Sequence, residues 1–216
     1  MYAGVVVSAG RYISETDLVK GTWGNVSYRH VDRVWITPSG IPYNRLSEEM
    51  IAVVDLKSGE WIGGSEKPSS ELPLHLEIYR TFQDIKAVVH FHGVYSSAFS
   101  ALRKDVPCYT EDQAQIIGGT IRVARYAPPG TWELARNAVR ALEGRFGVIL
   151  ANHGAVAIGR SMDEALIAAE ILEKSCHIAI LVNGKGFELP EEDVNLLRTR
   201  YLDSYSKKLI MPGEEG

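Results

Sequence analysis

The chain has 216 residues, of which 45% are hydrophobic and 23% charged, as is typical of a globular protein that buries a sizeable core. Its formal net charge of -4, without any run of Lys and Arg, disfavours a nucleic-acid partner but leaves room for a local anion pocket. No stretch approaches the roughly 18 apolar residues that a transmembrane helix needs. The first residues lack the basic start of a targeting segment. The two cysteines, Cys108 and Cys176, do not have the spacing of a metal or redox motif. We therefore expect a cytoplasmic protein without membrane or nucleic-acid partners.

The N-terminal segment is predicted to be helical. Residues 2–20 place apolar side chains at helical spacing, and the helix should end at Gly21. The stretch that follows, GTWGNVSYRH, has two glycines around Thr22 and Trp23 and then the alternation of a strand. Two interpretations remain open here: a small-residue loop that presents Thr22 and Asn25 to a ligand, or a tight turn before a hairpin.

The next segment predicts short strands separated by turns. VWITPSGIPYNRLS begins as a strand, turns at Pro38-Ser39-Gly40, and reaches Ser47, which caps a single helical turn. IAVVDLKSGEWIGG is typical of a hairpin that turns at residues 57–59, and a loop follows at 63–68.

A helix is predicted to begin at Pro68-Ser69-Ser70-Glu71 and to run to about Phe82. Ser69 and Ser70 are either ordinary N-caps or part of an anion site, because free N–H groups and the helix dipole both favour negative charge there. His75, further along this helix, is interpreted as structural.

The stretch KAVVHFH at residues 86–92 predicts a buried strand with two histidines. Because side chains alternate along a strand, His90 and His92 project from the same face, about 6.5–7 Å apart. Two imidazoles so placed can bind one divalent ion such as zinc. An H-x-H pair by itself is also common as two structural histidines, so the pair needs further ligands to define a site.

The C-terminal half continues to alternate between helices and strands. Strands are predicted at 121–127 and at 147–159, and the second is interrupted at Asn152-His153-Gly154. Helices are predicted at 95–102, 131–143, 162–182 and 191–206. A short helical or coil segment is expected at 111–117, and a polar tail from about 211. No repeat, low-complexity block or linker is found, so we expect one domain over residues 1–216. The mixture of hairpins and helices predicts an α/β fold, a mixed sheet covered by helices on both faces.

A catalytic zinc usually has three protein ligands and keeps one position open. His153 is the best third histidine, because small residues around it break an apolar strand and bring its ring to a strand end. Glu71 is a plausible fourth ligand or base, as a carboxylate in the first turn of a helix. His177, in contrast, lies in an apolar helix and is interpreted as a core residue.

Five blocks of the sequence carry a resemblance to a known family: GTWGNVSYR, ITPSGIPYNRL, KPSSELPLHLEIYR, AVVHFHGVYSSAFSAL and LANHGAVAIG. In this order, over most of residues 18–182, they resemble the class II aldolase/adducin-head family, which includes L-fuculose-phosphate aldolase and L-ribulose-phosphate 4-epimerase. The resemblance implies a three-layer α/β/α sandwich with a central mixed sheet. It also implies a cyclic homotetramer with its active sites between subunits.

The resemblance further implies a metal site and a phosphate pocket. The metal ligands fall on His90, His92 and His153, and Glu71 takes the place of a catalytic glutamate that also touches the metal. The implied phosphate-binding positions are Asn25, Ser39, Gly40, Ser69 and Ser70. The implied reaction is a zinc-dependent retro-aldol cleavage of a phosphorylated ketose, of the ketose 1-phosphate type, to dihydroxyacetone phosphate and an aldehyde. Cobalt or manganese are the alternatives to zinc.

The sequence departs from the family at the proton donor. Where fuculose-phosphate aldolases have a tyrosine, PCYTEDQAQIIGG has Asp112 with Glu111 beside it, and where the epimerases have an aspartate it has Gln115. Glu111 or Asp112 would either act in a neighbouring subunit's catalytic site or be surface acids. Tyr201 and Tyr205 in the last helix are further candidates for a donor, or packing residues.

Two other functions therefore stay open. A metal-dependent epimerase, dehydratase or decarboxylase on a related sugar phosphate would use the same metal ligands. A non-catalytic binding module, like the adducin heads, would have no need of those ligands, and this chain retains all of them.

Overall fold

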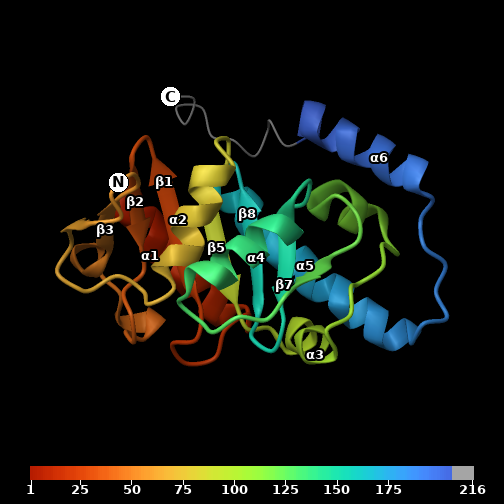
Figure 1. The fold of residues 1–216 in the computed structure, drawn as a ribbon, viewed down its shortest axis with the longest axis horizontal. Coiled ribbons are helices and arrows are strands. Elements are labelled where there is room, and N and C mark those ends of the chain that lie inside the picture. Colours follow the sequence, from red (N-terminus) through yellow and green to blue (C-terminus); the bar gives the residue numbers. More distant parts are fainter. Residues whose placement is uncertain (206–216) are drawn as a thin grey trace.

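The computed structural model describes residues 1–205, and its strands form one eight-stranded mixed sheet (Figure 1). The strands lie in the order β4-β3-β2-β1-β5-β8-β7-β6. All neighbours are antiparallel except β6 and β7, which are parallel. The strand bounds are β1 Asn25–His30, β2 Arg33–Ile36, β3 Ala52–Asp55, β4 Trp61–Gly63, β5 Ala87–Phe91, β6 Arg122–Ala124, β7 Gly147–Leu150 and β8 Ala155–Gly159.

Helices cover both faces of this sheet, as the sequence predicted. In Figure 1, α2 and α4 lie in front of the sheet and contact each other, whereas α1 and α5 lie behind it. The helix bounds are α1 Tyr2–Glu15, α2 Leu72–Thr81, α3 Val94–Leu102, α4 Trp132–Leu142, α5 Met162–Val182 and α6 Glu191–Arg200. Short helical turns are η1 Tyr43–Arg45, η2 Glu48–Met50, η3 Gln113–Ile117 and η4 Tyr201–Tyr205. The result is a three-layer α/β/α sandwich.

The central strand β5 is buried along its whole length because β1 and β8 pair with it on either side. Asn25 of β1 stands directly opposite His90, and Val156 of β8 stands opposite His90 on the other side. A run of apolar residues that is buried on both faces is what such a central strand requires. The pairing brings the start of β1, the end of β5 and the start of β8 to one place in the middle of the sheet.

Helix α1 is shorter than predicted, because it ends at Glu15 instead of near residue 20. The Thr16 backbone N–H and hydroxyl both donate to the Tyr12 carbonyl, which closes the last turn. Asp17 then adopts a left-handed conformation with φ of 60°. The residues that follow the helix pass next to the end of β5, where the N–H of His92 donates to the Leu18 carbonyl at 3.0 Å. The segment therefore becomes part of the site region.

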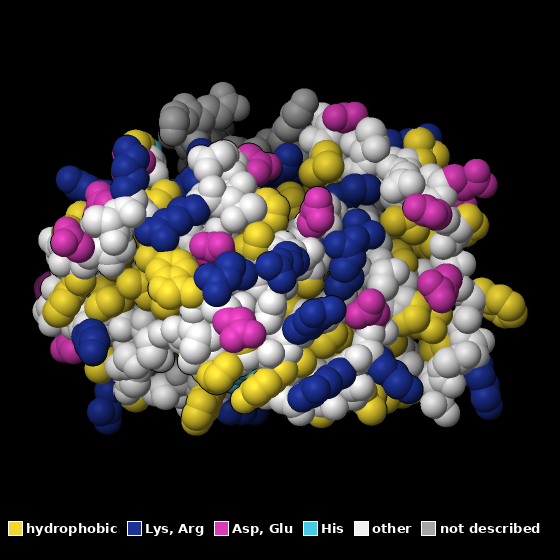
Figure 2. Space-filling model, in the orientation of Figure 1, with side chains coloured by type: hydrophobic (Ala, Val, Ile, Leu, Met, Phe, Trp, Pro, Cys, Tyr) yellow, Lys and Arg dark blue, Asp and Glu magenta, His cyan; other side chains and the backbone are white. Residues whose placement is uncertain are grey.

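Basic side chains gather over α4 and the neighbouring strand β6, on the face shown in Figure 2. Arg122, Arg125 and Arg140 border a shallow hollow there, with Asp105 as the acidic residue among them. These arginines are spread over the sequence, so composition alone could not reveal the patch.

The C-terminal helical segment continues through the described residues to Tyr205, close to the predicted end at about residue 206. Helix α6 stops at Arg200 and is followed by the wider turn η4. The predicted polar tail from about residue 211, like the side chain of Tyr205, lies outside what the structure describes. Within residues 1–205, no helix combines the length and apolar character needed to cross a membrane.

Candidate active site

Three histidines from distant parts of the chain converge at the C-terminal end of β5. His90 lies within the strand, His92 follows its last residue, and His153 lies in the turn between β7 and β8. Their ligand atoms all lie within 4.8 Å of one another, and His90 Nε2 is 3.0 Å from His92 Nε2. Such a cluster can hold one divalent cation. It contains the same three histidines that the sequence predicted.

Glu71 adds a carboxylate to this cluster. It immediately precedes α2, and its Oε2 is 2.9 Å from His90 Nε2 while its Oε1 is 3.3 Å from His153 Nε2. Within residues 1–205, Glu71 Oε1 and His153 Nδ1 are buried atoms that make no hydrogen bond. Imidazoles and a carboxylate with unused polar atoms form a donor set that fits zinc or a similar divalent ion.

Helix α3 holds the turn that carries His153. Ser100 Oγ accepts a hydrogen bond from His153 N–H at 2.8 Å and donates one to the Leu150 carbonyl at 2.6 Å. Gly154 follows, and a Cβ at this position would lie 2.6 Å from the Phe91 carbonyl and close to the neighbouring imidazoles. The sequence NHG therefore combines a ligand with the residue that lets the turn approach β5.

Removing the Ser100 hydroxyl is expected to loosen the metal site. Because the hydroxyl fixes the turn at two points, Ser100→Ala should lower the affinity for a divalent metal by about 10- to 100-fold, the range seen for partners that orient metal ligands. Competition with a chromophoric chelator measures this affinity. Ser97→Ala, on the same helix, is the matched control and should leave it unchanged. Equal affinities for the two variants would contradict the role of Ser100.

A buried hydrogen-bond chain orients Glu71. Ser27 Oγ lies 2.6 Å from His75 Nδ1, His75 Nε2 lies 2.5 Å from Asn25 Oδ1, and Asn25 Nδ2 donates to Glu71 Oε2 at 3.0 Å. Burial, together with the positive charge of His90, lowers the pKa of His75 to about 3. His75 is therefore neutral at neutral pH and donates through Nε2 to Asn25, which turns the amide N–H of Asn25 toward Glu71.

The sequence did not reveal this positioning role of His75, which was interpreted as structural. His75 lies outside the histidine cluster, as that interpretation implies. The available signal was its spacing from Glu71, because residues four apart share one face of a helix.

The charges of the cluster favour the protonation states that a metal ligand needs at Glu71, His92 and His153, but not at His90. Burial, and then the charges of His90 and His153, lowers the pKa of His92 to about 3. Burial and His90 lower the pKa of His153 to about 4. Burial would raise the pKa of Glu71, but the interactions with His90, His153 and Asn25 outweigh it and hold this pKa well below its usual range. Glu71 in turn outweighs the burial of His90 and raises the pKa of His90. His92 and His153 are therefore neutral imidazoles beside an ionised carboxylate, whereas the raised pKa of His90 opposes the loss of the proton that a metal ligand must give up.

A cavity of about 670 Å³ opens onto this cluster. Glu71, His92 and His153 line it, and so do all five residues to which the sequence resemblance assigned phosphate binding: Asn25, Ser39, Gly40, Ser69 and Ser70. Thr22 lines it as well, which agrees with the first of the two interpretations of the glycine-bracketed loop. The structure thus brings three of the four predicted metal-site residues and the predicted anion pocket into one cavity, and the fourth, His90, is fully buried next to them.

A tertiary contact joins the two serine loops. Pro38 and Pro68 form an isolated β-bridge, which sets Ser39 beside the start of α2. Ser69 Oγ accepts a hydrogen bond from Glu71 N–H at 3.2 Å, whereas the Ser70 side chain is exposed. Ser69 therefore shapes the first turn of α2, and Ser70 is free to meet a ligand.

Among the cavity-lining residues that the sequence did not single out as site residues are Lys20, Trp23 and Asn152. Lys20 Nζ lies 2.5 Å from Asp17 Oδ1 on the surface. Lys20 and Trp23 could have been found from the sequence, because each precedes a glycine of the loop in which Thr22 and Asn25 were considered as ligand-facing residues.

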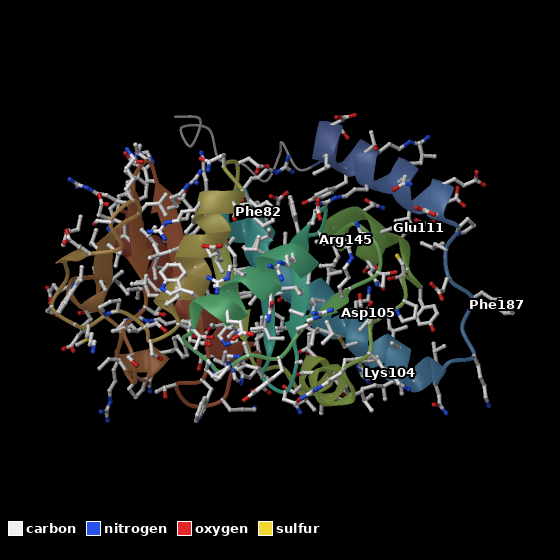
Figure 3. All side chains as sticks on the ribbon, in the orientation of Figure 1. Phe82, Lys104, Asp105, Glu111, Arg145 and Phe187 are labelled. Atoms are coloured by element: carbon white, nitrogen blue, oxygen red, sulfur yellow. The ribbon has the colours of Figure 1, made fainter. Side chains whose placement is uncertain are left out.

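Of the predicted proton donors, Glu111, Asp112 and Tyr201 do not line this cavity, and the side chain of Tyr205 lies outside the described residues. Asp112 forms an ion pair with Lys174 and caps η3, and Glu111 lies beside α6 (Figure 3). Tyr201 is buried, and its hydroxyl donates to Glu164 at 2.9 Å. A role of these residues in catalysis would require the site of another subunit and stays a prediction. His177 stacks on Tyr95 with ring centroids 3.8 Å apart, outside the histidine cluster.

The three-layer fold, with a cluster of three histidines and a glutamate that borders a cavity at the end of β5, defines a candidate metal-dependent enzyme. The model of the class II aldolase and adducin N-terminal domain family matches residues 5–180. An L-fuculose phosphate aldolase of Methanococcus maripaludis is 39% identical over 165 residues, which are 76% of this chain and 88% of the relative. A 5-deoxy-D-ribulose 1-phosphate aldolase of Bacillus thuringiensis serovar kurstaki is 34% identical over 200 residues, 91% of this chain and 93% of the relative.

A solved structure of an L-fuculose 1-phosphate aldolase superposes with a TM-score of 0.89 at 36% identity, covering 93% of this chain and 96% of the other. The chain therefore belongs to the class II aldolase and adducin N-terminal domain family. Its relatives place it among the aldolases of that family, which are carbon–carbon lyases.

Proposed function

We propose that this protein is a zinc-dependent lyase that cleaves a ketose 1-phosphate, by a retro-aldol reaction, to dihydroxyacetone phosphate and an aldehyde. The observation that carries the proposal is that a cluster of three imidazoles and one carboxylate borders, through His92, His153 and Glu71, the cavity that the two serine loops also line. The aldolase relatives support the reaction type.

The metal would be held by His90, His92 and His153, with Glu71 beside it. When bound, a divalent ion supplies Lewis-acid stabilisation of the negative charge that develops on substrate oxygens during cleavage. Neutral imidazole ligands suit this task because they leave the charge of the ion largely intact. Zinc is the proposed ion, since this donor set is one of its usual ones.

The phosphate would be bound by the serine loops at the start of α2. Ser39, Ser69 and Ser70 supply hydroxyl groups, and the first turn of α2 supplies the positive end of the helix dipole. Asn25 and Gly40 complete the wall of the pocket. Binding the remote phosphate orients the carbons to be separated, which can contribute several kcal/mol to catalysis.

Glu71 is the proposed base. In the cleavage direction the C4 hydroxyl of the ketose loses its proton, the C3–C4 bond breaks, and C3 gains a proton to complete dihydroxyacetone phosphate. Because the hydroxyl oxygen and C3 are both bonded to C4 before cleavage, one carboxylate can take the proton from the hydroxyl and return it to the carbon. Glu71 Oε1 is suited to this transfer, because it makes no hydrogen bond within residues 1–205 and belongs to a residue that lines the cavity. Glu111 or Asp112 of a neighbouring subunit remains the predicted additional proton donor, within the predicted homotetramer.

The proposal is tested by incubating purified protein with a panel of ketose 1-phosphates, with and without a chelator. We expect dihydroxyacetone phosphate, detected by an NADH-linked reduction, from at least one substrate and only in the absence of chelator. If no substrate yields it, the aldolase assignment fails. Mass spectra of the same mixtures identify the alternatives: an unchanged mass indicates epimerisation, loss of water dehydration, and loss of carbon dioxide decarboxylation.

A further inference from the structure

A second pocket lies at the opposite end of the sheet from the histidine cluster. Its volume is about 320 Å³, and Phe82 and Arg145, which are labelled in Figure 3, are among the residues that line it. Ile85 also lines this pocket and comes just before β5, whereas the histidine cluster lies at the other end of that strand. The pocket shares no lining residue with the candidate active-site cavity and is therefore separate from it.

Three arginines from distant parts of the chain line this second pocket. Arg145 lies between α4 and β7, Arg160 lies just before α5, and Arg198 lies in the last turn of α6. All three side chains are half-buried, whereas Asp84, the acidic residue that lines the same pocket, is exposed. The lining side chains thus carry three positive charges and one negative charge.

Within residues 1–205, Arg160 is the one arginine of the three that forms an ion pair with a carboxylate. Its guanidinium donates to Glu164 through Nε at 3.1 Å and through Nη2 at 2.8 Å. In the same part of the chain, Arg145 and Arg198 donate to backbone carbonyl groups, and the Nη2 of each makes no hydrogen bond. These two guanidinium groups are therefore held in place by the fold but not neutralised by it.

Two positive charges that are half-buried near each other without a counter-charge are costly for the fold. Burial, together with the charges of Arg160 and Arg145, lowers the pKa of Arg198 to about 10, although Glu164 and Tyr201 act in the opposite direction. The pKa of Arg145 is also lowered, first of all by burial. Both groups remain protonated at neutral pH, so an anion in the pocket would neutralise charge that the fold leaves unpaired.

The lining of the pocket indicates the class of this anion. A phosphate group suits two guanidinium groups, because it accepts paired hydrogen bonds from arginine and its charge at neutral pH approaches -2, whereas a single carboxylate carries -1. Leu142, Ile158 and Leu202 make another part of the wall apolar. The volume lies at the lower end of the range for small-molecule sites. The ligand should therefore be small, with a phosphate at one end and an apolar body.

We propose that this pocket is a second ligand site, which binds a small phosphate monoester through Arg145 and Arg198. The phosphate oxygens accept hydrogen bonds from the two guanidinium groups, and the body of the ester lies against the apolar wall. The site is independent of the proposed catalytic function, because it shares no residue with the candidate active site.

The experiment must first separate this site from the candidate active site, which is also proposed to bind phosphate. Titrations therefore use Ser70→Asp, whose added carboxylate repels phosphate from the serine loops. Isothermal titration calorimetry with phenyl phosphate should still show binding to this variant. Phenyl phosphate should bind at least about tenfold more tightly than inorganic phosphate, which lacks the apolar body. It should also bind at least about tenfold more tightly than benzoate, which has the same ring but a smaller charge.

Variants made in the Ser70→Asp background locate the binding. Arg145→Gln removes one cation and should weaken phenyl phosphate binding by about tenfold or more. Arg198→Lys retains the charge but loses the planar fork, so it should also weaken binding, and it tests the site if Arg145→Gln does not fold. Arg140→Gln, in the basic hollow beside β6, is the matched control and should bind like its parent.

Three outcomes would overturn the proposal. The first is that phenyl phosphate does not bind to Ser70→Asp, and the second is that benzoate or inorganic phosphate binds as tightly as phenyl phosphate. The third is that the folded Arg145 or Arg198 variant, identified by circular dichroism, keeps the affinity of its parent. None of these results depends on cleavage of a sugar phosphate, so the proposed function is tested separately.

Discussion

Glu71→Gln is expected to lower kcat by about 10²- to 10⁴-fold, the usual contribution of a positioned general base. The amide has the shape of the carboxylate, and its oxygen can still accept the hydrogen bond from Asn25 Nδ2 that the structure gives to Glu71. It cannot, however, take up a proton. KM should therefore change little, because substrate binding relies on the serine loops. Single-turnover kinetics with the substrate found in the panel, together with KM, measure both effects.

The matched control for this change is Glu77→Gln on the same helix, which removes an equal charge from a residue that does not line the cavity. It should keep full activity. Metal content and circular dichroism of Glu71→Gln should equal those of wild type, which excludes loss of fold as the cause. Activity within about threefold of wild type would remove Glu71 from the role of base.

The parts of the site that depend on local sequence could be predicted. The alternation of a strand is enough to place His90 and His92 on one face, and the small residues next to His153 are enough to place it in a turn at a strand end. The start of α2 could be predicted from Pro68, Ser69, Ser70 and Glu71 together. In each case a short-range rule of backbone geometry determines where the side chain points.

The parts that depend on distant contacts could not be predicted. No local pattern shows that Pro38 pairs with Pro68, that Ser100 holds the His153 turn, or that His75 orients Asn25. These contacts appear only after β1, β5 and β8 have paired and α2 and α3 have packed on the sheet. The end of α1 was missed for a related reason. Leu18 and Val19, after Glu15, continue the apolar spacing of a helix. In the structure they are buried although the chain has already left the helix.

His92→Ala is expected to reduce the affinity for zinc by more than about 100-fold, and cleavage activity with it. The change removes a proposed ligand, which should cost more than removal of a residue that only orients one, for which about 10- to 100-fold is usual. His92 is the best histidine to replace, because His90 also donates through Nδ1 to the Ala155 carbonyl and is fully buried, so its loss would disturb the sheet. The measurement is zinc per chain after dialysis against a fixed free zinc concentration.

Thermal unfolding provides a second measurement that does not depend on activity. An ion that binds the native state but not the unfolded one stabilises the fold by mass action, so added zinc should raise the Tm of the metal-free wild type. It should leave the Tm of His92→Ala unchanged over the same concentrations. His30→Ala, at the end of β1 and outside the histidine cluster, should respond to zinc like wild type. An equal rise in Tm for His92→Ala would mean that the ion binds without His92, and a three-histidine metal centre could then no longer be the basis of catalysis.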